Sequence, residues 1–329
     1  MSALGPTLEA FFTERLISQR RASPNTVAAY RDTFRLLLRF LAETRATPPS
    51  RLRLEDLDAP VVAAFLDHLE VDRGVKVATR NARLAAIHSF FRYASLRHPD
   101  HAGLITRVLA IPAKRTDRTT IAFLNDPEME ALLAAPDRST RLGRRDHALL
   151  ALGLQTGLRV SELTGLRCQD IALGTGAHVR CSGKGRKERA TPLSPQTAAI
   201  MRAWLDERDG APPDALFPGP RGKALTRDAV RRLLARHVAT AVSHGSSISS
   251  KRVAPHVLRH SCAMNLLESG VDTAVIALWL GHESIRTTDI YKHADMGMKE
   301  RALARTTPTK TTLRRYRPDD ELLRFLEGL

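Results

Sequence analysis

The stretch RRDHALLALGLQTGLRVSELTGL, residues 144–166, contains a helix pattern, a stop and the start of a second helix. Its first part repeats apolar residues at intervals of three and four, as one face of an α-helix does. Gly157 ends that pattern, because glycine readily adopts the left-handed conformation that closes a helix. Arg159 is therefore expected near the start of the next helix, beside a tight turn.

The same spacing predicts helices on both sides of this stretch. Before it, helices are expected over residues 7–19, 26–43, 59–71 and 77–96, and after Asn125-Asp126-Pro127. After it, they are expected over residues 194–208, 226–242, 254–269 and 271–280. Short runs over residues 168–174, 178–185 and 186–194 indicate a small antiparallel sheet with Lys184 at a hairpin tip. The predicted fold class is thus mainly α with a small antiparallel β-sheet.

The length of 329 residues suggests two domains. The segment IPAKRTDRTT, residues 111–120, is polar and basic and lacks an apolar period, so it is expected to be a linker. We predict a helical domain over residues 1–111, a linker over 112–120, a second domain over 121–305 and a C-terminal extension over 306–329.

The composition points to an anionic partner. The formal net charge is +16 and the sequence pI is about 10.6. Residues 1–112 carry 16 Lys and Arg against 11 Asp and Glu, and residues 113–329 carry 35 against 24, so both halves are basic. This distribution favours two domains that grip one polyanion.

Several other classes of protein are disfavoured by the sequence. No run of 18 apolar residues and no basic leader is present, so we expect neither a membrane protein nor a secreted one but a cytosolic one. The three cysteines, Cys168, Cys181 and Cys262, form no C-x-x-C pair. They are expected to be reduced and partly buried thiols instead of a disulfide framework or a zinc site.

Some basic residues are candidates for contact with a nucleic-acid backbone. Arg31, Arg35 and Arg39 form a stripe at intervals of four on one helix. Such a stripe could face phosphates, but a solvated helix surface explains it equally well. Further candidates are Arg80, Arg186 and Lys187.

The most informative residues occur in order between Gly157 and Tyr291. They lie in GLRVSEL (157–163), GKGRKER (183–189), APHVLRH (254–260), LGHES (280–284) and TTDIYKH (287–293), and they are Arg159, Glu162, Lys184, His256, Arg259, His282 and Tyr291. His256 and Arg259 share a helix face, and His260 is expected to point elsewhere as a structural or surface residue. The pattern gathers cations around a phenol.

Such a set is suited to phosphoryl transfer. A tyrosine hydroxyl with a pKa of about 10 is a weak nucleophile near pH 7 and needs activation. Attack on a DNA phosphodiester places negative charge on the nonbridging oxygens, which two arginines can hold through paired planar donors. The leaving 5′ oxygen needs a proton, and a lysine crowded by Arg186 and Lys187 could supply one.

These motifs closely resemble the tyrosine recombinase (phage integrase) family, from about Leu8 to Arg305. The resemblance implies a helical SAM-like core-binding domain, followed by a mixed α/β catalytic domain, that together form a clamp around DNA. It implies that Arg159 and Arg259 bind the phosphate, Lys184 is the general acid, His256 and His282 are the active-site histidines and Tyr291 is the nucleophile. Glu162 matches the family's acidic position after the first arginine.

The implied activity is site-specific recombination through a 3′-phosphotyrosyl intermediate, in integration, excision or resolution, without metal, ATP or cofactor. The implied partners are double-stranded DNA sites and other subunits in a tetramer, in the cytoplasm at the nucleoid. The segment over residues 276–308 is similar to recombinases carried on mobile elements. The apolar LLRFLEGL, residues 322–329, is expected to form a helix that docks on an adjacent subunit or on its own chain.

Three other interpretations of these residues compete with this one. His256 and His260 have the i, i+4 spacing of a metal-ligand pair, but Val257 stands where a zinc protease has glutamate and Arg259 would repel a cation. A type IB topoisomerase uses a similar set of residues on a single duplex. A non-catalytic DNA-binding regulator is a third class, and the intact set of candidate residues argues against it.

Overall fold

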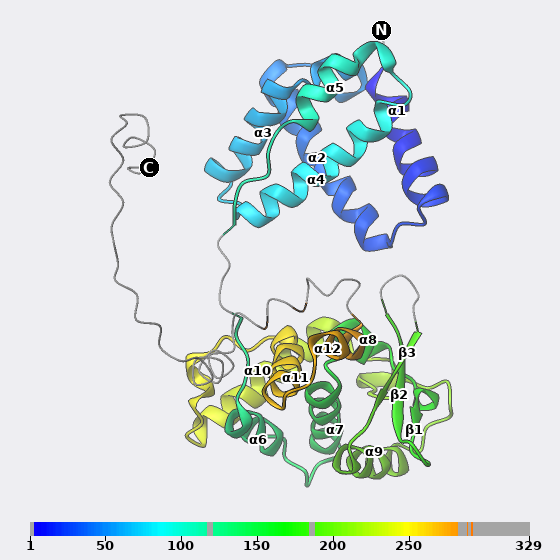
Figure 1. Cartoon of the computed structure of the whole chain (residues 1–329), viewed down its shortest axis with the longest axis vertical. Helices are drawn as coiled ribbons and strands as arrows, with labels where there is room; N and C mark the ends of the chain where they lie inside the picture. The colour runs from blue at the N-terminus through cyan, green and yellow to red at the C-terminus, as the bar shows by residue number, and fades with distance from the viewer. Residues whose placement is uncertain (1–2, 117–120, 184–187, 282–287, 289–290, 292–329) are drawn as a thin grey trace, which may run out of the picture. The chain divides into compact units, whose positions relative to one another are not determined.

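The computed structural model describes residues 3–116, 121–183 and 188–281, together with Thr288 and Tyr291. The chain divides into two compact units, Met1–Thr119 and Thr120–Leu329 (Figure 1). Within the described residues, no helix is both long and apolar enough to cross a membrane.

The N-terminal unit is helical. Its α-helices are α1 (Leu4–Ala10), α2 (Pro24–Arg45), α3 (Ala59–Val71), α4 (Val77–Ala94) and α5 (Ala102–Leu109), with a π-helix over Phe11–Gln19 and 3₁₀ turns over Pro49–Arg51, Leu54–Asp56 and Pro99–His101. The predicted helices over residues 26–43, 59–71 and 77–96 are confirmed as α2, α3 and α4. The helix predicted over residues 7–19 is confirmed, but only its first residues are α-helical, because α1 ends at Ala10 and continues as the π-helix.

Local capping and aromatic packing define this unit. The Ser23 hydroxyl accepts a hydrogen bond from the Thr26 amide and Pro24 occupies the first turn, which together start α2. The centre of the unit is aromatic: the Phe34 and Phe90 rings lie 5.3 Å apart, and both are buried. Such ring pairs contribute roughly 0.5–1.5 kcal/mol beyond the area they bury.

The C-terminal unit combines helices with one small sheet. Its helices are α6 (Asp126–Ala134), α7 (Arg141–Thr156), α8 (Val160–Gly165), α9 (Pro195–Arg208), α10 (Arg227–Ser243), α11 (Pro255–Glu268) and α12 (Thr273–Leu280), with 3₁₀ turns over Cys168–Asp170, Pro220–Gly222 and Ser247–Ser250. Its strands are β1 (Ile171–Ala172), β2 (His178–Ser182) and β3 (Glu188–Pro192). The predicted fold class is confirmed.

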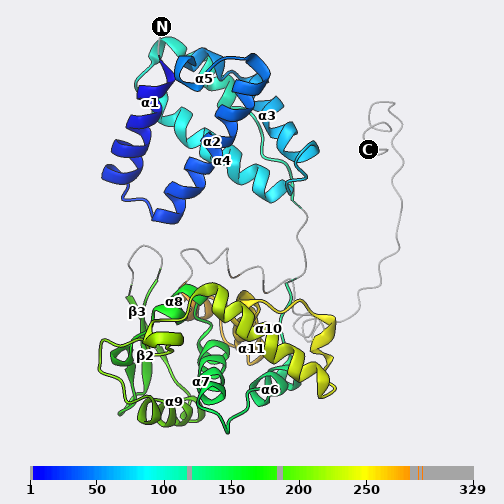
Figure 2. The same ribbon diagram turned by 180° about the vertical axis from the view of Figure 1, so that it is seen from behind.

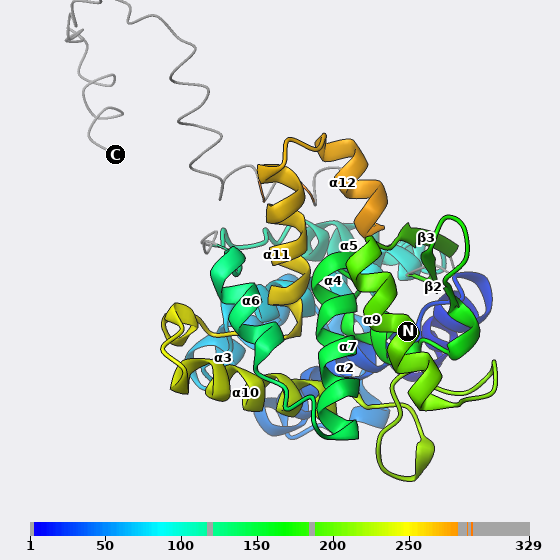
Figure 3. The ribbon, with the colours of Figure 1, turned by 90° about the horizontal axis from the view of Figure 1, so that it is seen from below.

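Helix α7 is the centre of this unit. Nearly all of its residues from Ala148 to Thr156 are buried, as expected of a helix that is apolar on every side. The sheet lies at one end of the unit and α6 and α10 lie at the other, with α7 between them (Figures 1 and 2). Seen along the perpendicular direction, α7 runs between α11 and α9 (Figure 3).

The three strands form an antiparallel sheet in the order β1-β2-β3. Strands β2 and β3 pair from His178 opposite Pro192 to Ser182 opposite Glu188. Val179 and Cys181 point inward on β2, whereas Arg180 is exposed, which is the alternation of a half-buried strand. The sheet therefore brings residue 189 and its neighbours to the same side of the unit as α8.

The cysteines agree with the prediction of reduced thiols. Cys168, Cys181 and Cys262 are free and buried. Burial raises the pKa of each thiol, and for Cys262 the value is about 12. None of the three is poised to act as a thiolate near neutral pH.

Candidate active site

Arg159 lies at the N-cap of α8, immediately after the turn that closes α7. The turn depends on Gly157, whose φ of +61° places it in the left-handed region. A Cβ at Gly157 would lie 2.5 Å from Leu280 Cδ2, so this position requires glycine for space as well as for conformation. The predicted placement of Arg159 at a helix start is confirmed.

Glu162 holds Arg159 in place. Its Oε2 accepts from the Arg159 backbone amide at 2.8 Å and its Oε1 accepts from Arg159 Nη1 at 2.8 Å. Burial by itself would raise the pKa of Glu162, but hydrogen bonds from Arg189 and Arg159 outweigh it and lower the pKa. Glu162 is therefore an anion at neutral pH, fixed between two arginines.

Arg259 lies on α11 and is only 8% exposed. Its Nη1 donates to the Gly157 carbonyl and its Nη2 donates to the Leu280 carbonyl, each at 2.7 Å. Burial, with repulsion from Arg159, lowers the pKa of Arg259 to about 10. The guanidinium therefore remains a cation at neutral pH.

The two arginines meet at the end of α12. Arg159 Nη2 donates to the Gly281 carbonyl at 3.1 Å, and Arg259 donates to the preceding carbonyl, that of Leu280. Gly281 ends α12 with a φ of +64°. Two residues separated by one hundred positions in the chain thus place their guanidinium groups on consecutive backbone carbonyls.

Tyr291 is buried beside this pair. The residue is 1% exposed and packs in a cluster with Cys262, Met264 and Leu280. Burial raises the pKa of its phenol to about 12, and the positive charges of Arg259 and Arg159 act in the opposite direction. At pH 7 roughly one molecule in 10⁵ then carries a phenolate, so attack by this oxygen requires the removal of its proton.

His260 contacts the phenol of Tyr291 from α11. Its Nδ1 lies 3.0 Å from Tyr291 Oη, within hydrogen-bond distance, and its ring centroid lies 5.4 Å from that of His256. The expectation that His260 points away from His256 was wrong, because side chains four residues apart on a helix lie on one face. His256 itself is exposed.

Protonation of His260 is expected to destabilise the fold. Burial, helped by the nearby His256 and Arg259, lowers the pKa of His260 to about 4 from an unfolded value of 6.5. The unfolded chain therefore binds more protons between these values. The neutral His260 thus contributes to the free energy of unfolding in full above pH 6.5, and this contribution is lost as the pH falls through about 4.

We predict that His260→Asn makes the free energy of unfolding less dependent on pH in this window. The difference should be on the order of 1 kcal/mol after allowance for solvent screening. Urea denaturation at pH 7 and pH 4.5 measures it. An equal pH dependence in the variant and the wild type would contradict the assignment.

Four of the candidate residues lie outside the described residues: Lys184, Arg186, Lys187 and His282. The first three follow β2 in the sequence and His282 follows Gly281. Their roles remain predictions.

The candidate DNA-contact residues of the N-terminal unit occupy different environments. Arg31, Arg35 and Arg39 are all exposed on α2, as the stripe requires. Arg80 is 5% exposed, and its Nη1 donates to the Pro112 carbonyl at 3.2 Å. Arg80 is therefore buried against a partner in its own unit, and it offers little surface for contact with DNA.

The metal interpretation finds no ligand set in the described part of the chain. No group of three or more His, Cys, Asp or Glu side chains converges there. The metal interpretation was based on His256 and His260. The Nδ1 atom of His260 lies within hydrogen-bond distance of the Tyr291 hydroxyl.

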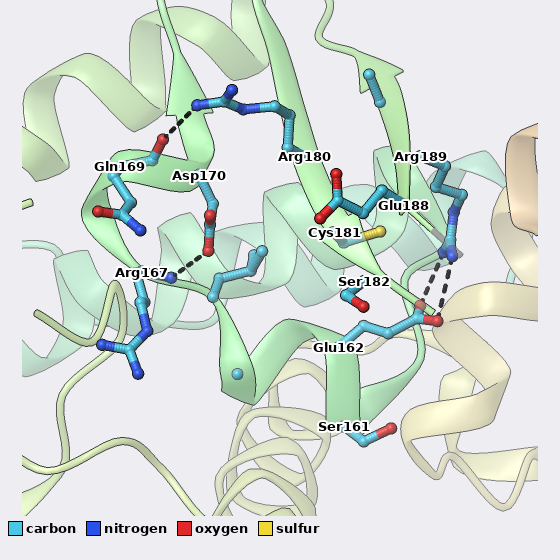
Figure 4. Close-up of a pocket in the computed structure, with 13 residues that line it drawn as sticks. Ser161, Glu162, Arg167, Gln169, Asp170, Arg180, Cys181, Ser182, Glu188 and Arg189 are labelled. Atoms are coloured by element: carbon cyan, nitrogen blue, oxygen red, sulfur yellow. Dashed lines mark hydrogen bonds and ion pairs between the residues drawn. The ribbon is translucent and has the colours of Figure 1, made fainter. Parts of the chain in front are cut away.

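Arg189 is a site residue that the sequence analysis missed. It projects from β3 toward Glu162 on α8, and the two form a bidentate ion pair (Figure 4). A groove of about 740 Å³ lies beside this pair, lined by Ser161, Gly165, Arg180 and Ser182 among others. Side chains alternate along β3, so residues 189 and 191 share its inner face. This alternation was the signal from which the inward position of Arg189 could have been predicted.

Comparison with known proteins identifies the family. The phage integrase family matches residues 122–298, and the N-terminal SAM-like domain of phage integrases matches residues 10–98. The integrase/recombinase y4rC of Sinorhizobium fredii is 54% identical over 100% of this chain and 99% of that protein. Tyrosine recombinase XerD of Pseudomonas aeruginosa is 35% identical over 89% of this chain and 94% of that protein.

A solved structure is similar as well. The XerH site-specific recombinase bound to its difH substrate superposes with a TM-score of 0.65 at 25% identity, over 87% of this chain and 80% of that one. The sequence matches, the two arginines at the end of α12 and the buried tyrosine lead to one assignment. The chain belongs to the phage integrase family and carries that family's SAM-like domain ahead of its C-terminal unit.

Proposed function

We propose that the protein is a site-specific DNA recombinase that cuts and rejoins duplex DNA through a 3′-phosphotyrosyl intermediate. The observation that carries the proposal is the meeting of Arg159, Arg259 and Tyr291, which come from separate parts of the C-terminal unit. The matched recombinases named above support the same activity.

The arginines would bind the scissile phosphate. Arg259 directs two N–H groups at backbone carbonyls, and a guanidinium has five in total, so further donors remain for an anion. Donors fixed before the substrate arrives stabilise developing charge without reorganisation. Removal of one such donor typically lowers a rate constant by about 10²–10³-fold.

The cleavage step balances without an external reagent. In this proposal the Tyr291 hydroxyl gives its proton to His260 Nδ1, which lies 3.0 Å away. The Tyr291 oxygen forms a bond to phosphorus, the bond from phosphorus to the 5′ oxygen breaks, and the leaving oxygen takes a proton. In this proposal Lys184 supplies that proton, and His256 and His282 assist at the phosphate. Reversal of the step with a 5′ hydroxyl from another strand rejoins the DNA, so the phosphotyrosyl bond conserves the energy of the original bond.

The proposed partners follow from this chemistry. The substrate is double-stranded DNA with paired sites, and the working unit is a homo-tetramer on that DNA. In this proposal residues 1–111 form the core-binding domain, residues 121–305 the catalytic domain and residues 306–329 an extension that docks on an adjacent subunit. Action on chromosomal or mobile-element DNA places the protein in the cytoplasm at the nucleoid.

Covalent trapping tests the proposal. We expect that full-length protein, incubated with sheared genomic DNA of its source organism in EDTA and without ATP, leaves DNA covalently bound. Sequencing of the trapped 3′ ends should return one recurrent site. A synthetic duplex of that sequence, nicked so that the 5′-hydroxyl fragment diffuses away, should then accumulate the adduct.

The trapped ends, together with a plasmid relaxation assay, separate the alternatives. A topoisomerase would relax supercoiled plasmid irrespective of any particular site, and its trapped ends would share no sequence. A non-catalytic DNA-binding protein would form no adduct. Loss of the adduct in EDTA would restore a metal-dependent mechanism.

A further inference from the structure

Arg189 contacts both of the groups that hold Arg159. Its Nη1 donates to Glu162 Oε1 at 3.2 Å and its Nη2 donates to Glu162 Oε2 at 2.8 Å (Figure 4). Each of these oxygens also accepts a hydrogen bond from Arg159, from the side chain on Oε1 and from the backbone amide on Oε2. The carboxylate is thus a bridge between two arginines.

Arg189 also lies against the second anchor. A Cβ at Gly281 would come within 2.7 Å of Arg189 Nη1, which shows how closely this guanidinium packs on the end of α12. The Gly281 carbonyl is the acceptor for Arg159 Nη2. Displacement of Arg189 would therefore loosen Arg159 at both of its contacts.

A direct contact of Arg189 with DNA does not explain this geometry. The side chain is 13% exposed and Glu162 is 4% exposed, and both terminal nitrogens of Arg189 point at the carboxylate. Arg159, by comparison, is 33% exposed, so it is the member of the trio that an incoming phosphate can reach. The bidentate geometry also requires arginine, because a lysine ammonium cannot match a carboxylate at two points.

We propose that Arg189 is a positioning residue for the strand-cleavage reaction: by holding Glu162 and the end of α12, it fixes the guanidinium of Arg159 where a scissile phosphate would bind. This proposal rests on the proposed recombinase function wherever it is tested by measuring DNA cleavage. The alternative is an ion pair that serves the stability of the fold and nothing else, and a buried ion pair is by itself weak support for either role.

A double-mutant cycle on the nicked duplex separates the two roles. At saturating DNA, we expect Arg189→Met to lower the rate constant of adduct formation by about 30-fold or more with the DNA dissociation constant within about threefold, since one misplaced donor costs on this order. Arg159→Met should cost about 10²–10³-fold, and the double variant should be no slower than Arg159→Met alone. The proposal would be overturned if the double variant were slower by the product of the two single losses in rate constant, or if Arg189→Met lowered the rate constant by less than about threefold.

Two variants control for folding. Arg144→Met removes another bidentate ion pair, with Glu207, between α7 and α9, and should leave the rate constant unchanged. Arg189→Lys retains the charge and keeps one contact, so it should recover part of the rate that Arg189→Met loses. Failure of Arg189→Lys to exceed Arg189→Met would count against positioning.

A second measurement does not require activity. Phenylglyoxal modifies arginine side chains, and the rate at Arg159 can be followed by peptide mass spectrometry in the full-length protein. That rate should rise several-fold in Arg189→Met and stay at the wild-type value in Arg144→Met. Failure of the wild-type protein to form an adduct would refute the proposed function. A rate of Arg159 modification that is unchanged in Arg189→Met would, independently, refute the positioning role.

Discussion

Tyr291→Phe is expected to abolish formation of the covalent adduct, by at least about 10³-fold, with the DNA dissociation constant within about threefold of the wild type. The change removes only the phenolic oxygen, which is the atom proposed to attack phosphorus. The ring remains to fill its place against Cys262, Met264 and Leu280. Because Tyr291 is 1% exposed, it contributes little surface for DNA to bind.

The nicked duplex, resolved on a denaturing gel, measures the adduct, and fluorescence anisotropy measures the affinity. Loss of the hydrogen-bond partner of His260 should lower the free energy of unfolding by about 1 kcal/mol, so the variant should remain folded. An adduct that persists in Tyr291→Phe would move the nucleophile to another residue.

Arg259→Gln is expected to have the second-largest effect. We predict a fall of about 10²–10³-fold in the rate constant of adduct formation, because donors that face the developing phosphate charge are lost. The carbonyls of Gly157 and Leu280 lose their donors as well, and each orphaned buried carbonyl costs about 1–3 kcal/mol of unfolding free energy. The effect on rate must therefore be measured well below the midpoint of thermal unfolding.

A methylphosphonate at the scissile position supplies the control. It lacks one nonbridging charge, so the penalty of Arg259→Gln should shrink by about tenfold or more on this substrate if the guanidinium acts on that charge. An equal penalty on phosphate and methylphosphonate would mean that Arg259 acts through the fold alone. Arg236→Gln on α10, which removes an exposed arginine from the same unit, provides a control that should leave the rate constant unchanged.

Much of the fold could be predicted from local sequence signals. Helices α2 and α3 begin where a capping Ser23 and Asp58 are followed by an early proline, and apolar periodicity carries each helix to its end. The π-helix over residues 11–19 could not be predicted, because its apolar spacing is compatible with an α-helix and the difference lies in tertiary packing. Helix α5 spans 8 residues, fewer than the window of about 11–18 residues over which a helical period is read.

The candidate site divides in the same way. The helix start at Arg159 and the hairpin strands follow from glycines and alternation, which are local signals. The contacts of His260 and Arg189 depend on which distant side chain each one meets, Tyr291 or Glu162. One sequence does not contain that information, and the burial of Arg80 escaped prediction for the same reason.

The carbonyls that receive Arg259 and Arg159 belong to the C-terminal ends of α7 and α12, where each helix macrodipole carries partial negative charge. These dipoles soften the mutual repulsion of two neighbouring cations, in addition to the negative charge that Glu162 places beside Arg159. An anion-binding centre assembled in this manner keeps its shape while it is empty. Little of the free energy of DNA binding is then needed to order these two guanidinium groups.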